Sequence, residues 1–168
     1  MLTSLEKQVF NYIESNRDPI IKFLQEMIRI DTQTPPGHDY DKLCDTLVDK
    51  YHNLGYQTSL HTATPKYLKL SGATHMGLVG PRTNIVAKLK GKGKTTMHIS
   101  AHTDTAAIQT EGWTKNPLGG EVTKTTPYEK SIHDKGGGYI WGRGVADDKG
   151  ELASLTAATI SSRVIPLQ

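Results

Sequence analysis

A histidine and an aspartate separated by one residue, His102 and Asp104, are the side chains in this sequence best suited to chemistry. They close the stretch Thr95–Thr105, TTMHISAHTDT, whose alternating apolar residues are typical of a buried strand that ends in a loop. A neutral imidazole is a good zinc ligand, and a carboxylate two residues later can fix the tautomer of that imidazole. The pattern therefore predicts a metal ligand, His102, with Asp104 as its orienting carboxylate.

A second stretch, Tyr139–Gly150, YIWGRGVADDKG, places two adjacent carboxylates after a predicted strand. The carboxylate of Asp147 can bridge two metal ions, since each oxygen can bind one. Two divalent cations would lower the pKa of a shared water and polarise the carbonyl that it attacks. Each motif alone also fits a satisfied polar loop or a helix cap. Together they favour metal-dependent hydrolysis of an amide bond.

Length and composition indicate one globular domain. The chain has 168 residues, 36% hydrophobic and 22% charged, with a net charge of +3 and basic residues spread among 17 acidic ones. This distribution favours a solvated surface over a nucleic-acid interface. No apolar run approaches the roughly 18 residues of a membrane span. We expect a soluble, cytoplasmic protein whose single cysteine, Cys44, packs in the core.

Hydrophobic spacing predicts an α/β fold in which a mixed sheet is flanked by helices. Two amphipathic helices, or one helix bent near Asn16–Pro19, open the chain, with Asp18 as the N-cap of the second part. A third helix covers Leu43–Leu54, and Gly55 comes after its last turn. The other expected elements are a strand at 56–61, a polar loop at 62–81, a hairpin of strands 84–89 and 95–100, a strand at 139–141 and a helix from 149 or 151 to 161.

The two motifs can meet at one edge of such a sheet. Open α/β sheets place their sites at the carboxyl ends of strands, and His102 and Asp147 each come after a predicted strand. If the two strands are neighbours, these residues converge although they lie far apart in the sequence. The sequence permits this convergence and does not by itself show it.

The motifs SAHTDT, GWTKNP and GRGVADDKGELAS, found in this order, resemble the M20 family of co-catalytic zinc peptidases and amidohydrolases. Two earlier segments agree. IRIDTQTPPG resembles the end of the family's N-terminal helix and its PPG loop, and TNIVAKLKGKG resembles its first hairpin. The resemblance covers most of the chain and implies hydrolysis of a peptide or N-acyl amino acid through a metal-bridged hydroxide.

The resemblance also implies a role for each motif residue. His102 would bind one of two zinc ions, Asp147 would bridge both, and Asp104 would be the catalytic residue that orients His102. Cobalt or manganese are alternatives to zinc. The peptide bond between Asp147 and Asp148 would be cis, Arg143 would shape the loop that presents Asp147, and Asp148 would bind no metal.

The sequence departs from the family beyond the bridging aspartate. Family members supply a Glu pair, a further carboxylate, a lid domain and a late histidine, whereas Glu151 is the only carboxylate here after Asp148. We therefore expect residues 1–168 to form part of a catalytic domain. A homodimer is expected only if the protein has the lid domain. Thr105–Ala107 also replaces an apolar pair and a proline, and residues 127–135 resemble an insertion.

Two functions remain open at this point. In the first, the chain is the N-terminal part of a zinc hydrolase that acts on a small N-acyl amino acid or peptide, with no nucleic-acid or membrane partner. In the second, it is a truncated, non-catalytic fragment that binds at most one metal ion weakly. Nucleotide binding through GRGVAD fails, because Asp147 replaces the third glycine of a GxGxxG fingerprint.

Overall fold

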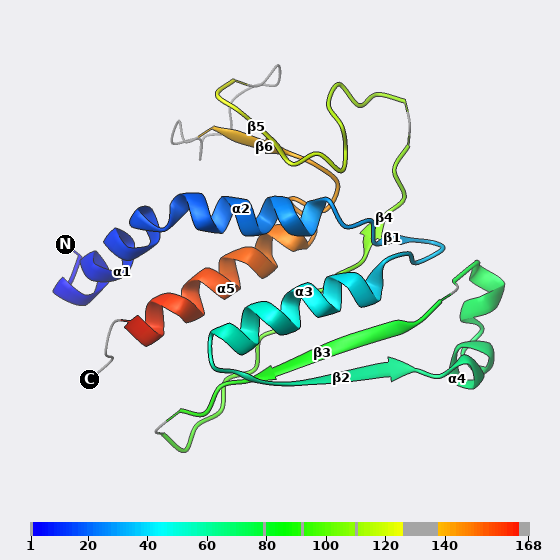
Figure 1. The fold of residues 1–168 in the computed structure, drawn as a ribbon, viewed down its shortest axis with the longest axis horizontal. Helices are drawn as coiled ribbons and strands as arrows, with labels where there is room; N and C mark the ends of the chain where they lie inside the picture. The colour runs from blue at the N-terminus through cyan, green and yellow to red at the C-terminus, as the bar shows by residue number, and fades with distance from the viewer. Residues whose placement is uncertain (1, 79, 92, 110, 126–137, 165–168) are drawn as a thin grey trace.

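The fold is that of a computed structural model, which describes residues 2–78, 80–91, 93–109, 111–125 and 138–164 (Figure 1). The helices are α1 (Ser4–Ser15), α2 (Arg17–Ile28), α3 (Tyr40–Asn53), α4 (Pro65–Leu70) and α5 (Lys149–Val164), with a 3₁₀ turn, η1 (Ala73–Met76). The strands are β1 (Gln33–Thr34), β2 (Gln57–Ala63), β3 (Arg82–Lys88), β4 (Thr105–Ala106), β5 (Glu121–Thr123) and β6 (Tyr139–Trp141). The α/β class is confirmed. The insertion expected at 127–135 lies outside the described residues.

The first two helices meet at Asn16, as the hydrophobic spacing predicts. Thr3 and Glu6 form a capping box at the start of α1: the Thr3 N–H donates to Glu6 at 2.6 Å, and the Glu6 N–H donates to Thr3 Oγ1 at 3.2 Å. The predicted N-cap at Asp18 is wrong, because Asp18 already lies in the first turn of α2 and Asn16 is the N-cap. The negative charge of Asp18 there is favoured by the positive end of the helix dipole.

The end of α3 agrees closely with the prediction. Gly55 adopts a left-handed φ of 77°, which glycine reaches without strain. Its N–H donates to His52 O at 2.8 Å, and the Tyr56 N–H donates to Tyr51 O at 2.9 Å. These two bonds satisfy carbonyls that the last helical turn leaves open, so the chain turns sharply into β2.

The predicted hairpin between strands 84–89 and 95–100 is wrong, because β3 has a different partner. β3 pairs antiparallel with β2, with Leu60 opposite Ile85, and residues 95–100 belong to no strand. Met97 and Ile99 are 80% and 48% exposed. Alternating apolar residues form a stable strand only where a partner covers one face, and the described residues provide none beside 95–100.

The segment between β2 and β3, expected to be a polar loop, contains the short helices α4 and η1. Thr64 Oγ1 accepts the Tyr67 N–H at 3.2 Å, and Pro65 occupies the first turn of α4, which are both common features of a helix start. α4 buries no residue, and Leu70 is 76% exposed. A helix without an apolar face has no periodicity from which to predict it.

The core lies where α2, α3 and α5 pack together, with the β2–β3 pair beyond α3 and the β5–β6 pair beside α2 (Figure 1). Its buried members are Phe23, Met27, Ile30, Leu43, Leu47, Leu152 and Ala153. Cys44 is 1% exposed, and its thiol approaches Thr83 O at 3.5 Å, so the prediction of a packed cysteine is confirmed. Within the part of the chain that the structure describes, the strands pair into three separate two-stranded sheets, of which only β1–β4 is parallel.

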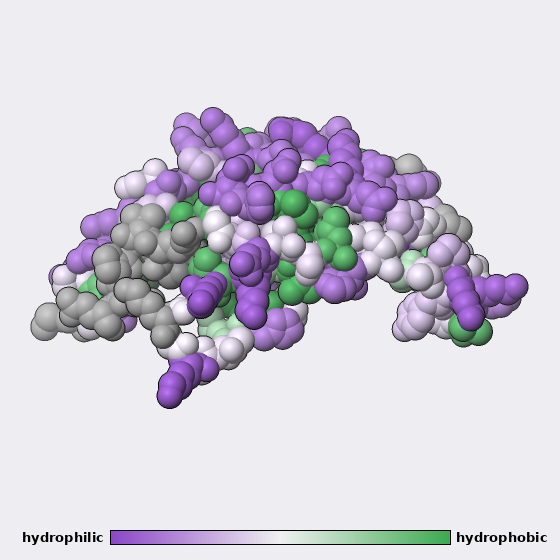
Figure 2. All heavy atoms as spheres, turned by 60° about the horizontal axis from the view of Figure 1, so that its bottom comes forward, coloured by the Kyte–Doolittle hydropathy of each residue, from purple (hydrophilic) through white to green (hydrophobic). Residues whose placement is uncertain are grey.

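The face shown in Figure 2 is mostly hydrophilic, with apolar residues gathered near its middle. Leu60, Val86, Met97 and Ile99 are among the large apolar side chains that are about half exposed or more. Within the described ranges, no helix combines the length and the apolar character that crossing a membrane requires.

Truncation of Leu43 tests the position of the core. Leu43→Ala removes a fully buried side chain between α2, α3 and α5 and should lower the free energy of unfolding by about 2 to 5 kcal/mol. Leu70→Ala, at an exposed position, should change it by less than about 0.5 kcal/mol. Urea unfolding followed by circular dichroism measures both, and equal effects would contradict this core.

Candidate metal-binding site

The segment that carries His102 and Asp104 is held by β1 and by Thr32, the residue directly before β1. β1 and β4 pair in parallel, with Gln33 opposite Thr105. The fully buried Thr32 makes two bonds to the segment, since its Oγ1 donates to Thr103 O at 2.7 Å and its carbonyl accepts the Thr105 N–H at 2.9 Å. The backbone on both sides of Asp104 is therefore fixed from one neighbouring residue.

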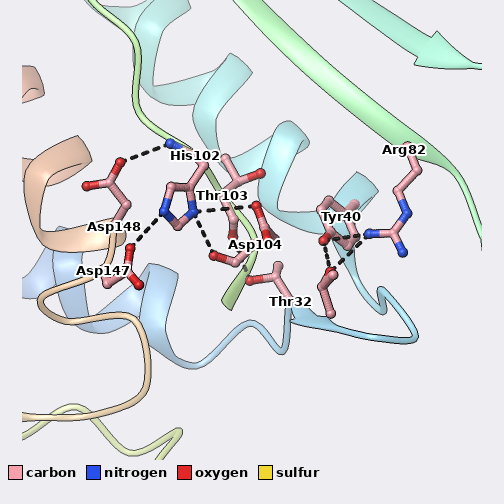
Figure 3. Close-up of polar contacts among 9 residues, drawn as sticks. Thr32, Tyr40, Arg82, His102, Thr103, Asp104, Asp147 and Asp148 are labelled. Carbon is pink, nitrogen blue, oxygen red and sulfur yellow. Dashed lines mark hydrogen bonds and ion pairs between the residues drawn. The ribbon is translucent and has the colours of Figure 1, made fainter. Parts of the chain in front are cut away.

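The side chains of His102 and Asp147 meet directly (Figure 3). Nε2 of His102 lies 2.8 Å from Asp147 Oδ1, and Nδ1 lies 3.0 Å from Asp104 O and 3.4 Å from Asp104 Oδ1. The structure thus brings together the three residues that the sequence singles out. The route differs from the expected one, because residues 95–100 are not a strand and β6 pairs with β5.

Nε2 of His102 faces a carboxylate oxygen of Asp147, and Nδ1 faces the backbone carbonyl oxygen of Asp104. With the Asp147 carboxylate ionised, both oxygens accept hydrogen bonds and neither can donate one. Burial lowers the pKa of His102, but the hydrogen bond to Asp147 and the contacts with Asp104 raise it by more, so the pKa lies above its ordinary value of 6.5. Without a metal ion, the arrangement therefore stabilises the imidazolium form more than water does.

The loop that presents Asp147 is anchored in the core by Lys149. The Lys149 side chain is fully buried, and its Nζ donates to Met27 O at 2.9 Å and to Ile30 O at 2.8 Å. Burial lowers the pKa of Lys149 to about 8. Sequence reasoning missed this residue, and its only signal was a lone cation at the start of an Ala- and Leu-rich helix.

Arg143 connects the same loop to the segment after β4. Its backbone N–H donates to Pro117 O at 2.7 Å, its Nη2 donates to Ala107 O at 3.3 Å, and its guanidinium lies 5.5 Å from the centre of the Trp113 ring. These contacts place Arg143 within the framework of the loop.

Asp148 is the second residue that sequence reasoning missed. The peptide bond between Asp147 and Asp148 is cis, as the resemblance implied. The Asp148 side chain turns away from Asp147, and its Oδ2 accepts the backbone N–H of His102 at 3.0 Å (Figure 3). The loop therefore contacts His102 twice, once at the ring and once at the backbone.

The imidazole of His102 and the carboxylate of Asp147 are of the kinds that bind zinc, but they are fewer than a zinc ion needs. An imidazole nitrogen and a carboxylate oxygen that face one another are ordinary zinc ligands, but a zinc ion takes four. Among the described residues, no group of three or more His, Cys, Asp or Glu side chains is arranged to hold a metal ion. His102 and Asp147 thus fit two positions of a coordination shell, and Asp104 fits beside the ring that it contacts.

Comparison with known proteins adds two distant relatives. The chain is similar to two bacterial amidohydrolases. It is 24% identical over 155 residues to N-formyl-4-amino-5-aminomethyl-2-methylpyrimidine deformylase of Halalkalibacterium halodurans, covering 90% of this chain and 30% of the relative. It is 29% identical over 135 residues to succinyl-diaminopimelate desuccinylase of Psychrobacter sp., covering 80% of this chain and 28% of the relative. No protein-family model matches the chain.

These likenesses concern less than a third of each relative, because the chain spans 30% and 28% of the lengths of the two proteins. Both relatives are hydrolases that act on amide bonds, as their names indicate. The likeness therefore supports a general amidohydrolase relationship for the matched residues.

The His102–Asp147 bond can be tested by titration. In the metal-free chain, Asp147→Asn should lower the pKa of His102, because the neutral amide no longer stabilises the imidazolium. Since the pKa is raised in the folded state, the pair stabilises the fold below pH 6.5, and this contribution is lost as the pH rises through the folded-state pKa. NMR titration of the His102 ring measures the change, and an unaltered pKa would contradict the contact.

The close packing of the loop can be tested at Gly150. A Cβ there would lie 2.0 Å from Val145 O, so Gly150→Ala should destabilise the fold although alanine is the better helix former. Gly91→Ala is the control, because its Cβ would meet no atom within 4 Å. Thermal unfolding should show a clearly lower midpoint for the first variant only, and a rise for both would refute the packing.

Proposed function

We propose that this chain is the N-terminal part of the catalytic domain of an M20-type, metal-dependent hydrolase that cleaves an amide bond. The observation that carries the proposal is the 2.8 Å approach of His102 Nε2 to Asp147 Oδ1, which unites two motifs 45 residues apart. The likeness of the chain to a deformylase and a desuccinylase supports the same reaction class. The proposed substrate is a small N-acyl amino acid or peptide.

His102 and Asp147 are the residues that would hold the metal, and zinc is the proposed ion. A bound zinc ion supplies a Lewis acid that polarises a carbonyl and lowers the pKa of water. Asp104 contacts His102 Nδ1 through its backbone and side-chain oxygens and thereby keeps Nε2 directed at Asp147. We assign Asp104 this orienting role.

The carboxylates around His102 also favour a cation electrostatically. Asp104 and Asp147 contact the His102 ring, and the pKa of Glu151 is raised by its hydrogen bond to Asp148 and by the nearby Asp147. A divalent cation bound at His102 and Asp147 would offset part of this negative charge. The same site would repel an anionic ligand that arrives without a metal ion.

The alternative is a fragment without catalysis that binds one metal ion weakly. The specific observation in its favour is that the described residues offer two facing donors where a zinc ion takes four. The two proposals share the same ligands and differ in whether a general base and further ligands join them from outside residues 1–168. Hydrolysis of N-acyl amino acids by a longer form of the chain would separate them.

Zinc binding by the 168-residue chain tests the proposed ligands. His102→Ala should weaken zinc binding by about tenfold or more, because it removes one of two facing donors. His98→Ala is the matched control, since His98 is exposed in the same segment and has no assigned role. Isothermal titration calorimetry measures both variants beside the unaltered chain.

Asp147→Asn should weaken zinc binding to a similar degree, since an amide oxygen is a poorer ligand for zinc than a carboxylate. Equal losses in His98→Ala and His102→Ala would count against the assigned ligands. Full zinc affinity in both His102→Ala and Asp147→Asn would overturn the proposal.

A further inference from the structure

We propose that Asp148 is a positioning residue that holds the backbone of His102 so that the His102 ring stays directed at Asp147. The inference deepens the proposed function and rests on it, because it assigns a role to a residue beside the proposed metal ligands. Neither the motif pattern nor the relatives assign Asp148 any role.

The contact that carries the inference joins segments far apart in the sequence. Asp148 Oδ2 accepts the N–H of His102 at 3.0 Å across 46 positions, and Asp148 is only 9% exposed. A charge-assisted bond to a backbone N–H in such a sheltered place is stronger than one at the surface. The Asp148 carboxylate therefore faces protein groups, the His102 N–H and the Glu151 side chain, more than solvent.

Asp148 lies at the start of α5, where a carboxylate has a nearer partner than the His102 N–H. Its carbonyl accepts the Leu152 N–H at 3.1 Å, which places Asp148 directly before the first turn. A carboxylate there commonly accepts an N–H of its own helix. Asp148 Oδ2 accepts instead the N–H of His102, in the segment that carries the proposed ligand, while the carboxylate also hydrogen-bonds Glu151 of its own helix. The Asp148 side chain therefore links the two motifs as well as the first turn of α5.

The backbone of His102 needs such a partner. Residues 95–104 form no strand, so no sheet ladder fixes the N–H of His102. Thr32 holds the residues after His102 through Thr103 O and the Thr105 N–H. Asp148 holds the N-terminal side of His102 from the opposite element, and the segment is thereby fixed on both sides of the ligand.

The adjacent residues Asp147 and Asp148 both contact His102, at different groups. Asp147 contacts the ring of His102, and Asp148 contacts its backbone (Figure 3). A single bond between ring and carboxylate would leave the two segments free to rotate about it. The second bond fixes their relative orientation, which is what a metal ion shared by His102 and Asp147 requires.

The test compares Asp148→Ala with Asp148→Asn in the metal-free 168-residue chain. The asparagine side chain keeps an oxygen that can accept the His102 N–H, whereas alanine keeps none. Hydrogen exchange of the His102 amide, measured by NMR, should be at least about tenfold faster in Asp148→Ala and within about threefold of the unaltered chain in Asp148→Asn. The Thr105 amide, which is bonded to Thr32, should exchange at an unchanged rate in both variants.

Zinc titration of the same variants links the contact to the proposed site. Asp148→Ala should raise the half-saturating zinc concentration by about tenfold, and Asp148→Asn should restore most of the affinity. Asp49→Ala, at a position of α3 outside the buried core, is the control for removal of one negative charge.

The outcomes separate this inference from the proposed function. An unchanged exchange rate at His102 in Asp148→Ala would overturn the positioning role, and so would faster exchange at His102 and Thr105 alike, which indicates general loosening. If the unaltered chain binds zinc, equal zinc affinity of the alanine and asparagine variants would also overturn it. Faster exchange at His102 alone, in a chain that binds no zinc, would support the contact and count against His102 and Asp147 as the proposed zinc ligands.

Discussion

The buried ammonium of Lys149 is the interaction on which the fold and the candidate site both depend. Its bonds to Met27 O and Ile30 O satisfy carbonyls at the end of α2, where the helix dipole is negative and a cation is favoured. Because Lys149 comes directly after Asp147 and Asp148, the same bonds that join α5 to α2 also set the position of the loop. Core packing and site geometry therefore cannot vary independently.

Close contacts also link the Asp147 loop to β4, which follows the segment that carries His102. Gly144 has a φ of 87°, and a Cβ there would lie 2.7 Å from Thr105 Cγ2, so the loop and β4 approach as closely as glycine allows. Thr32 then fixes the backbone between His102 and β4. The side chains that meet are thus carried by segments whose separation is set by packing.

The site itself is more open than its supports. Asp147 is 83% exposed at its side chain and His102 is 48% exposed, whereas Lys149 and Thr32 are fully buried. A buried framework that presents exposed donors is typical of a site that receives a ligand from solvent. With two facing donors in place, the framework accounts for the part of a metal shell that these 168 residues contribute under the proposed function.

Tertiary structure decided the features whose partners lie far away, and the sequence by itself determined those that depend on neighbours along the chain. The bend at Asn16, the left-handed Gly55 after α3 and the start of α5 result from spacing and local backbone preference. The sequence also singled out His102 and Asp147, with Asp104, as residues with a shared chemistry. It could predict their types and order because metal ligands and glycine-rich loops leave local patterns.

Long-range pairing and burial left no such pattern. The hairpin prediction failed because β3 pairs with β2, and pairing between distant strands is set by packing on α3 rather than by alternation. The contacts of Asp148 and Lys149 could not be predicted from local pattern, since their bonds reach across 46 and 122 positions. A carboxylate before a helix and a lysine within it look like surface residues until the fold places a backbone N–H or a helix end beside them.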